Sequence, residues 1–156
     1  MTRQTFQGSG QELSAEFGIE VRKDQFPAAN LFLPIGTREL EKSLLRMLGE
    51  AKRRGYSLKY IELILTNDAE QSAINKQFLG LRGPTNILSF PDPSEESGTL
   101  FLSIPTFCRE YFFYGQEPAC YLSRLLAHGV AHLCGLDHGE EMDGLCEELI
   151  KAGEGN

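Results

Sequence analysis

The three histidines of this 156-residue chain all fall within eleven residues, in the segment HGVAHLCGLDH. On a helix, His128 and His132 would project from one face at a separation that one metal ion can bridge, because they are four residues apart. Gly135 can take the left-handed conformation that ends a helix, so the chain can turn back and bring His138 to the same ion. Three imidazoles with one open position are typical of catalytic zinc. We therefore expect one Zn²⁺ per chain, held by His128, His132 and His138.

A fourth protein ligand would change the class of the site, because structural zinc usually has four. Cys134 lies between His132 and His138, but its place directly after Leu133 on the expected helix turns its side chain away from the first two histidines. The four cysteines of the chain form no C-x-x-C pair, which favours reduced thiols that fill the core. We favour a catalytic site and keep structural zinc, with Cys134 as a ligand, as the alternative.

The histidine spacing matches the metzincin protease pattern H-E-x-x-H-x-x-G-x-x-H. In that pattern the glutamate after the first histidine is the general base, whereas this chain has Gly129, which cannot accept a proton. Zinc lowers the pKa of bound water towards 7 and can generate a nucleophile without that base. The sequence thus predicts a metal-dependent hydrolase and disfavours a metalloprotease.

The elements that must position these residues follow from apolar periodicity and from turn residues. We expect strands at 18–22, 58–66, 86–90 and 99–104, and helices at 37–54, 67–80, 105–114, 118–134 and 140–152. This order predicts a single α+β domain over residues 1–156, with about five helices packed on a small mixed sheet of about four strands. The metal site would lie at the end of the long helix 118–134 and in the following turn. We expect residues 1–16 to be poorly ordered.

Charge and apolar content limit the partners of this chain. The net charge is −7, and residues 137–156 hold seven acidic residues against one base, so the rest of the chain is nearly neutral. A locally basic cleft is compatible with this distribution, but indiscriminate coating of nucleic acid is not, and we expect no DNA binding. We find no apolar run near the roughly 20 residues of a membrane span and no signal peptide, so we expect a cytoplasmic protein without membrane contact.

Two blocks of sequence carry a resemblance to a known family. The first block, H-G-x-x-H-L-x-G-x-D-H, is matched by His128, Gly129, His132, Leu133, Gly135, Asp137 and His138. The second lies in NKQFLGLRGPTNILSFP and is matched by Asn75, Gly80, Pro84, Thr85, Asn86, Leu88, Ser89, Phe90 and Pro91. Over about residues 56–150, the chain resembles the YbeY family of metal-dependent endoribonucleases. The resemblance implies a small sheet backed by helices, three histidine zinc ligands, single-stranded RNA as substrate, and a role in rRNA maturation and ribosome quality control at the small ribosomal subunit.

One departure from the family pattern concerns catalysis. Leu79 stands where the family usually carries an arginine thought to serve catalysis, so another positively charged residue must stabilise the charge of the phosphate. Arg82 follows three residues later, and Arg124 lies one helical turn before His128 on the same stripe. Both are candidate catalytic residues, with an exposed solvated arginine as the alternative for each. The family also tends to place an acidic residue where this chain has Thr99.

Three polar residues are candidates for supporting the site or binding substrate. Asp137 could accept a hydrogen bond from a ligand imidazole, or it could cap the following helix. Asn86 and Ser89 suit polar roles near the cleft, with hydrogen bonds at a strand end as the alternative. The function we expect is a zinc-dependent endoribonuclease that acts in rRNA processing. A metzincin-like metalloprotease and a non-catalytic, ribosome-associated protein with structural zinc are the alternatives.

Overall fold

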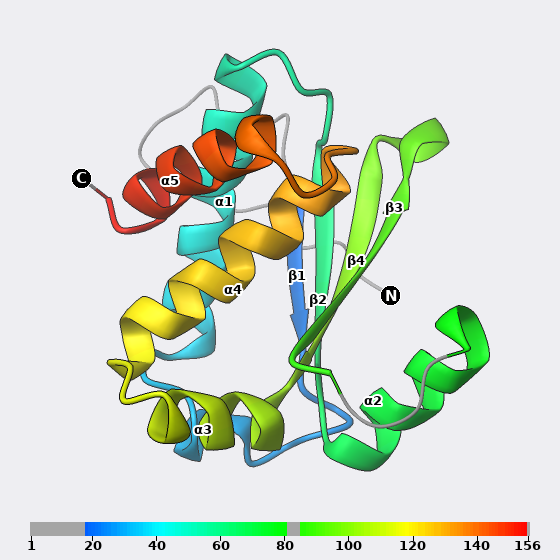
Figure 1. The fold of residues 1–156 in the computed structure, drawn as a ribbon, viewed down its shortest axis with the longest axis vertical. Coiled ribbons are helices and arrows are strands. Elements are labelled where there is room, and N and C mark those ends of the chain that lie inside the picture. Colours follow the sequence, from blue (N-terminus) through cyan, green and yellow to red (C-terminus); the bar gives the residue numbers. More distant parts are fainter. Residues whose placement is uncertain (1–17, 81–84, 156) are drawn as a thin grey trace.

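The computed structural model describes residues 18–80 and 85–155, which form one mixed sheet with helices on both sides (Figure 1). The strand order is β1-β2-β4-β3, with β1 and β4 parallel to β2 and β3 antiparallel to β4. The strands are β1 Gly18–Arg22, β2 Tyr60–Thr66, β3 Ile87–Asp92 and β4 Ser97–Ser103. All four expected strands are present, and the α+β prediction with a small mixed sheet is confirmed. Residues 1–16, expected to be poorly ordered, lie outside the described residues.

The described residues form five α-helices, as the sequence predicted, and three short helical turns. The α-helices are α1 Thr37–Arg53, α2 Asp68–Ile74, α3 Ile104–Phe113, α4 Pro118–Leu133 and α5 Glu140–Gly153. The short turns are η1 Ala29–Leu31, η2 Asn75–Leu79, which is π-helical, and η3 Pro93–Glu95. Helices α1, α4 and α5 lie together on one side of the sheet, and α2 lies on the other side (Figure 1).

The main core fills the space between the sheet and the helices α1, α4 and α5. Alternation along β4 directs Leu100 and Leu102, both fully buried, into this core, where they join Leu126 and Val130 of α4. The opposite face of the sheet carries a smaller aromatic cluster. There the ring of Phe90 packs edge-on against Phe78 and Phe101, with centroids 5.5 and 5.6 Å apart.

Most predicted boundaries move by one or two residues, and two of the differences have a clear structural cause. Strand β3 continues through Pro91, although the sequence predicted an end at Phe90. Because β3 is at the edge of the sheet, the missing N–H of a proline is tolerated there. The helix predicted at 67–80 is divided into α2 and η2. Its start is confirmed by the Asn67 side chain, which accepts a hydrogen bond of 2.8 Å from the Glu70 N–H, and its end by Gly80 at φ +67°.

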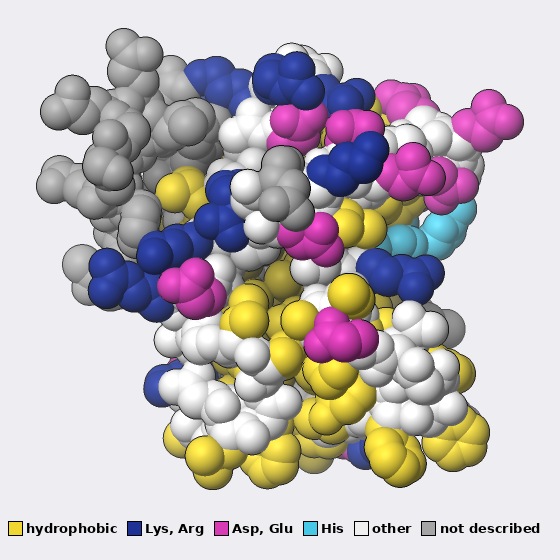
Figure 2. All heavy atoms as spheres, turned by 90° about the vertical axis from the view of Figure 1, so that its left-hand side faces the viewer, with side chains coloured by type: hydrophobic (Ala, Val, Ile, Leu, Met, Phe, Trp, Pro, Cys, Tyr) yellow, Lys and Arg dark blue, Asp and Glu magenta, His cyan; other side chains and the backbone are white. Residues whose placement is uncertain are grey.

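Charge and apolar side chains are unevenly distributed on the face drawn in Figure 2. The histidines lie at one edge, with acidic side chains above them and a basic side chain directly below. Hydrophobic side chains are exposed at the lower end of the molecule, the end at which α3 lies in Figure 1. Among the described residues, no helix is both long and apolar enough to cross a membrane.

A candidate metal centre at the end of helix α4

Helix α4 begins and ends with strong local signals, which fix the place of the histidines. The Glu117 carboxylate accepts hydrogen bonds from the N–H groups of Ala119 and Cys120 at the first turn. At the other end Gly135 is left-handed, at φ +90°, and the Leu136 N–H returns to the Ala131 carbonyl at 3.3 Å. This is the Schellman arrangement that reverses a chain after a helix. It carries residues 136–138 back beside the last turns of α4.

The reversal brings the three histidines together. One ring nitrogen from each of His128, His132 and His138 lies within 4.8 Å of the others. The Nε2 atoms of His128 and His132 are 3.1 Å apart, and Nδ1 of His132 lies 2.9 Å from the Leu136 carbonyl. The carbonyl can only accept, so this Nδ1 carries the proton and donates it, which leaves the Nε2 lone pair pointing into the cluster. The three nitrogens therefore suit a single divalent ion.

The protonation of His128 also favours a metal. Its burial, together with the neighbouring rings of His132 and His138, lowers the pKa of its imidazole below 6.5. The neutral form is therefore preferred at neutral pH, and the neutral imidazole is the form that coordinates metals. The donor set and its electrostatics therefore fit a metal ion better than three unrelated histidines.

Cys134 does not join this cluster. It lines a separate hollow with Ser57 and Leu58, and burial raises the pKa of its thiol to about 12. Within residues 18–80 and 85–155, no cysteine, aspartate or glutamate lies close enough to be grouped with the three histidines. This geometry favours a three-nitrogen site with an open side over a closed structural one.

Gly129 faces the sheet, not the histidines. A Cβ at this position would lie 2.9 Å from Leu100 and 3.0 Å from Ile87. Gly98 of β4 allows the same close approach from the side of the sheet, because a Cβ at this position would lie 2.4 Å from Leu133 of α4. The two glycines let α4 lie close on β3 and β4, where the Ser89 hydroxyl donates to the Gly129 carbonyl at 3.3 Å. A glutamate at position 129 would therefore point into the core and could not serve as a general base at the metal.

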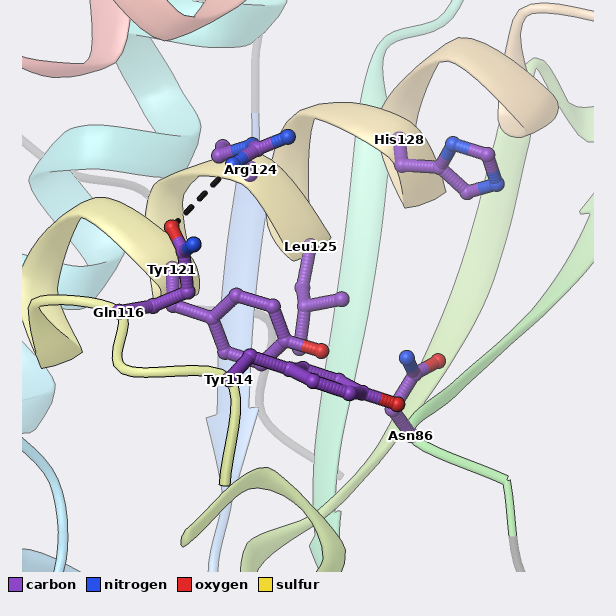
Figure 3. A pocket seen from close by; sticks show the side chains of 7 residues that line it. All are labelled: Asn86, Tyr114, Gln116, Tyr121, Arg124, Leu125 and His128. Carbon is purple, nitrogen blue, oxygen red and sulfur yellow. Dashed lines mark hydrogen bonds between the residues drawn. The ribbon is translucent and has the colours of Figure 1, made fainter. Parts of the chain in front are cut away.

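Two adjoining hollows flank the candidate metal centre. The metal hollow, of about 460 Å³, lies between β3 and the end of α4. Its polar lining comes from Asn86, Ser89, His128, His132 and Asp137. The aromatic hollow, of about 400 Å³, lies towards the start of α4. Figure 3 shows its lining, which consists of Asn86, Tyr114, Gln116, Tyr121, Arg124, Leu125 and His128. Asn86 and His128 belong to both hollows, so the two form one depression.

The polar residues singled out from the sequence lie around this depression, with one exception. Arg124 is exposed and lines the aromatic hollow, where its guanidinium donates to Gln116 at 3.3 Å (Figure 3). Asp137 lines the metal hollow and makes no hydrogen bond to a described residue. Helix α5 begins after Gly139 without a side-chain cap, so Asp137 does not cap it. Arg82, the other arginine proposed as a catalytic residue, lies outside the described residues.

Asn86 and Ser89 are both held by hydrogen bonds. The Asn86 side chain accepts from the Ile87 N–H at 2.6 Å and donates to Glu110 at 3.2 Å, so its orientation is fixed from both ends. The same Glu110 carboxylate accepts from the Tyr121 hydroxyl at 2.5 Å. Burial and this hydrogen bond raise the pKa of Tyr121 to about 12, which keeps it a neutral donor. Glu110 and Tyr121 could not be identified from the sequence, because no spacing rule connects residues of α3 and α4 to Asn86.

The fold and the cluster define a class of protein: a small α+β domain whose candidate metal ligands come from one helix end and the turn after it. A family model described as Endoribonuclease YbeY matches residues 33–151. The chain belongs to this endoribonuclease family, as the two sequence blocks had indicated.

Curated relatives support the assignment. The Endoribonuclease YbeY of Oleidesulfovibrio alaskensis is 39% identical, with 65% of this chain and 75% of the relative covered. The Endoribonuclease YbeY of Lawsonia intracellularis is 38% identical, with 76% and 86% covered. The solution structure of TM1509 from Thermotoga maritima matches with a TM-score of 0.59 and 20% identity over 88% of this chain and 89% of that one. This likeness supports the fold.

Proposed function

We propose that this protein is a zinc-dependent endoribonuclease that cleaves single-stranded ribosomal RNA during rRNA maturation and ribosome quality control. The observation that carries the proposal is the three-nitrogen cluster that opens into the metal hollow. A metal held there by His128, His132 and His138 would supply positive charge to a phosphate oxygen and a nucleophile from water. The names of the curated relatives support RNA as the substrate class. On this proposal the protein acts in the cytoplasm, with the small ribosomal subunit as its partner.

The residues around the cluster would orient the RNA. Arg124, one helical turn before His128, is the one cationic side chain among the described residues that line the two hollows, and its guanidinium can bind phosphate oxygens at two points. Asn86 and Ser89 offer polar groups on the opposite wall, on the β3 side. In this proposal Arg124 stabilises the charge on the phosphate, and Asn86 and Ser89 position the backbone of the RNA.

The alternatives are less consistent with the geometry. A metzincin-like protease needs a carboxylate general base, and position 129 points into the core. Among the described residues that line the metal hollow, the one carboxylate is Asp137, which directly precedes His138 in sequence. A structural zinc would need a fourth ligand, and Cys134 lines another hollow. The endoribonuclease proposal is therefore the one we test.

The test compares His132→Ala with Cys134→Ala. Wild-type protein, purified without a nickel column, should contain close to one equivalent of zinc by elemental analysis and should cleave a labelled single-stranded RNA. His132→Ala should lose both metal and cleavage, because two ligands retain little of the affinity of three. Cys134→Ala should keep both. Circular dichroism of His132→Ala should stay near that of wild type, which would show that the fold does not depend on the metal.

The opposite outcomes are equally clear. Loss of zinc from Cys134→Ala would favour the structural alternative. A wild-type protein that takes up no zinc at micromolar concentration would contradict the central claim. Equal and slow cleavage by wild type and His132→Ala would contradict the ribonuclease proposal, even with zinc bound.

A further inference from the structure

The aromatic hollow is a second recess beside the metal hollow, and the chemistry proposed above leaves most of its lining unused. Its volume of about 400 Å³ is within the range of small-ligand sites, roughly 300–1,000 Å³. One wall is α4, which carries both Tyr121 and Arg124, and a second wall is formed by Tyr114 at the end of α3. The rings of Tyr114 and Tyr121 both extend towards Asn86 (Figure 3). The recess therefore combines aromatic surface, amide groups and one positive charge.

Tyr114 presents the aromatic surface. It follows α3 and remains 63% exposed although it lines the hollow. Its ring meets Tyr121 edge-on, with centroids 6.4 Å apart, and Tyr121 is itself fixed by the hydrogen bond to Glu110. A large exposed aromatic ring next to a fixed one is a costly arrangement in water, and it is the type of surface on which nucleobases stack in single-stranded nucleic-acid sites.

Two amide side chains supply hydrogen-bonding groups at the hollow. Gln116 accepts from Arg124 through Oε1, so its amide nitrogen still has donors, and they make no hydrogen bond to a described residue. Asn86 donates to Glu110, its amide also contacts the Tyr121 hydroxyl, and its Oδ1 accepts from the Ile87 N–H, which leaves one acceptor position. Donors and acceptors of this kind match the polar edge of a base.

The position of the hollow matches the geometry of an RNA strand. Because Asn86 and His128 line both hollows, a group in the aromatic hollow lies directly beside a phosphate at the histidine cluster. Arg124 lines the aromatic hollow and lies on α4 between Tyr121 and His128 (Figure 3). A nucleotide next to the cleaved bond could thus place its phosphate near Arg124 and its base against Tyr114.

We propose that the aromatic hollow is a nucleobase subsite for one nucleotide that flanks the cleaved phosphodiester, with Tyr114 as the stacking surface and Gln116 as a hydrogen-bonding group for the base. This inference rests on the proposed function and extends it: the enzyme binds an unpaired, unstacked nucleotide, which a duplex cannot provide without opening. Selection for single strands then follows from the shape of the site beside the metal.

The experiment measures KM and kcat for cleavage of a labelled single-stranded RNA by wild type, Tyr114→Ala, Tyr114→Phe and Phe113→Ala. Phe113 is the matched control, because it directly precedes Tyr114, its side chain is 85% exposed, and it does not line the aromatic hollow. Loss of stacking should raise KM about 5- to 150-fold in Tyr114→Ala, with a smaller change in kcat. Tyr114→Phe, which keeps the ring, and Phe113→Ala should both remain near wild type.

A second arm uses RNAs with one abasic nucleotide on either side of the cleaved bond. At one of the two positions the missing base should raise KM of wild type by a factor similar to that of Tyr114→Ala, and should have no further effect in that variant. Equal KM values for Tyr114→Ala and Phe113→Ala, or abasic effects that add to the mutation, would overturn the subsite while the endoribonuclease proposal stands. If wild type cleaves no faster than His132→Ala, the proposed function fails, and the subsite fails with it.

Discussion

Arg124 tests the electrostatic part of the proposed mechanism at the scale of one side chain. A charged hydrogen bond to phosphate contributes about 1.5–3 kcal/mol, which corresponds to a roughly ten- to hundredfold effect on rate. Arg124→Ala should lower RNA cleavage by that factor and leave the zinc content unchanged, as measured by elemental analysis. Arg38→Ala, which removes an exposed arginine from the first turn of α1, is the control and should cleave at the wild-type rate. A wild-type rate for Arg124→Ala would contradict the role given to this residue.

Leu79 allows the complementary experiment, in which charge is added. The preceding Phe78 packs against Phe90 on the sheet face opposite α4, and Phe90 belongs to the edge strand β3, which forms one wall of the metal hollow. Leu79 itself is 51% exposed. An arginine there must extend around that edge to reach a phosphate. Leu79→Arg should raise cleavage about tenfold if phosphate charge is limiting. Leu79→Gln is the uncharged control; an equal gain from it would show that charge is not the reason.

The residues of the site differ in how far the sequence reveals them. The clustering of His128, His132 and His138 could be predicted, because the spacing of side chains on one helix and the turn after it is set by local geometry. Tyr114 and Gln116 could not, because their place beside His128 depends on how α3 and α4 pack. The run of exposed aromatic residues before Gly115 was an available signal, but an aromatic run alone does not indicate a hollow.

At the scale of elements, the position of α4 on the sheet depends on two glycines. A Cβ at Gly98 would lie 2.4 Å from Leu133, and one at Gly129 would lie 2.9 Å from Leu100. Overpacking of this kind costs typically about 1–3 kcal/mol. Gly98→Ala should therefore lower the free energy of unfolding by that amount, measured by urea denaturation. Gly129→Ala should lose less, because alanine gains about 1 kcal/mol of helix propensity over glycine.

Gly144 provides the control for this comparison. It lies on α5, and a Cβ there would have no atom within 4 Å. Gly144→Ala should stabilise the protein by the propensity gain alone, so its difference from Gly129→Ala measures the cost of packing α4 on the sheet. Equal changes at the two positions would show that α4 does not need a glycine at 129.

Most element boundaries could be predicted, since they depend on local signals such as the Asn67 cap, Pro118 and Gly135. The extension of β3 through Pro91 could not, because only its place at the edge of the sheet makes a proline acceptable. The order of the strands was also beyond sequence reasoning, since β2 pairs with β4 and not with the next strand in the chain. Pairing between distant segments is decided by the packing of the whole molecule.

At the scale of the whole molecule, ion pairs connect the end of α1 to α5. Glu50 pairs with Arg53 at 2.7 Å and with Arg54 at 2.9 Å, and Arg54 reaches Glu148 of α5 at 3.2 Å. Hydrogen bonds from Arg53 and then Arg54 lower the pKa of Glu50 from 4.5 to about 2. The depressed pKa means that this stabilisation is present above pH 4.5 and is lost as the pH falls towards 2.

The corresponding variant is Glu50→Gln. At pH 7 it should lower Tm by up to about 4 °C, since surface pairs contribute little and the domain is of moderate size. The difference in Tm from wild type should shrink as the pH falls from about 4.5 towards 2, measured by thermal denaturation at several pH values. A difference that persists at the lowest pH would assign the effect to packing and not to charge.

The eleven-residue span of the three candidate ligands has a consequence for the unfolded chain. The entropy of closing a loop grows slowly with its length, so a denatured chain can also gather three histidines that lie this close in sequence. Metal bound to the denatured chain offsets the stabilisation of the native one. At a free zinc concentration of 100 Kd, native-state binding alone would stabilise the fold by about 2.7 kcal/mol. We expect a smaller gain, found by measuring Kd calorimetrically and then the free energy of unfolding with and without zinc; a full gain would show that only the folded helix end binds the ion.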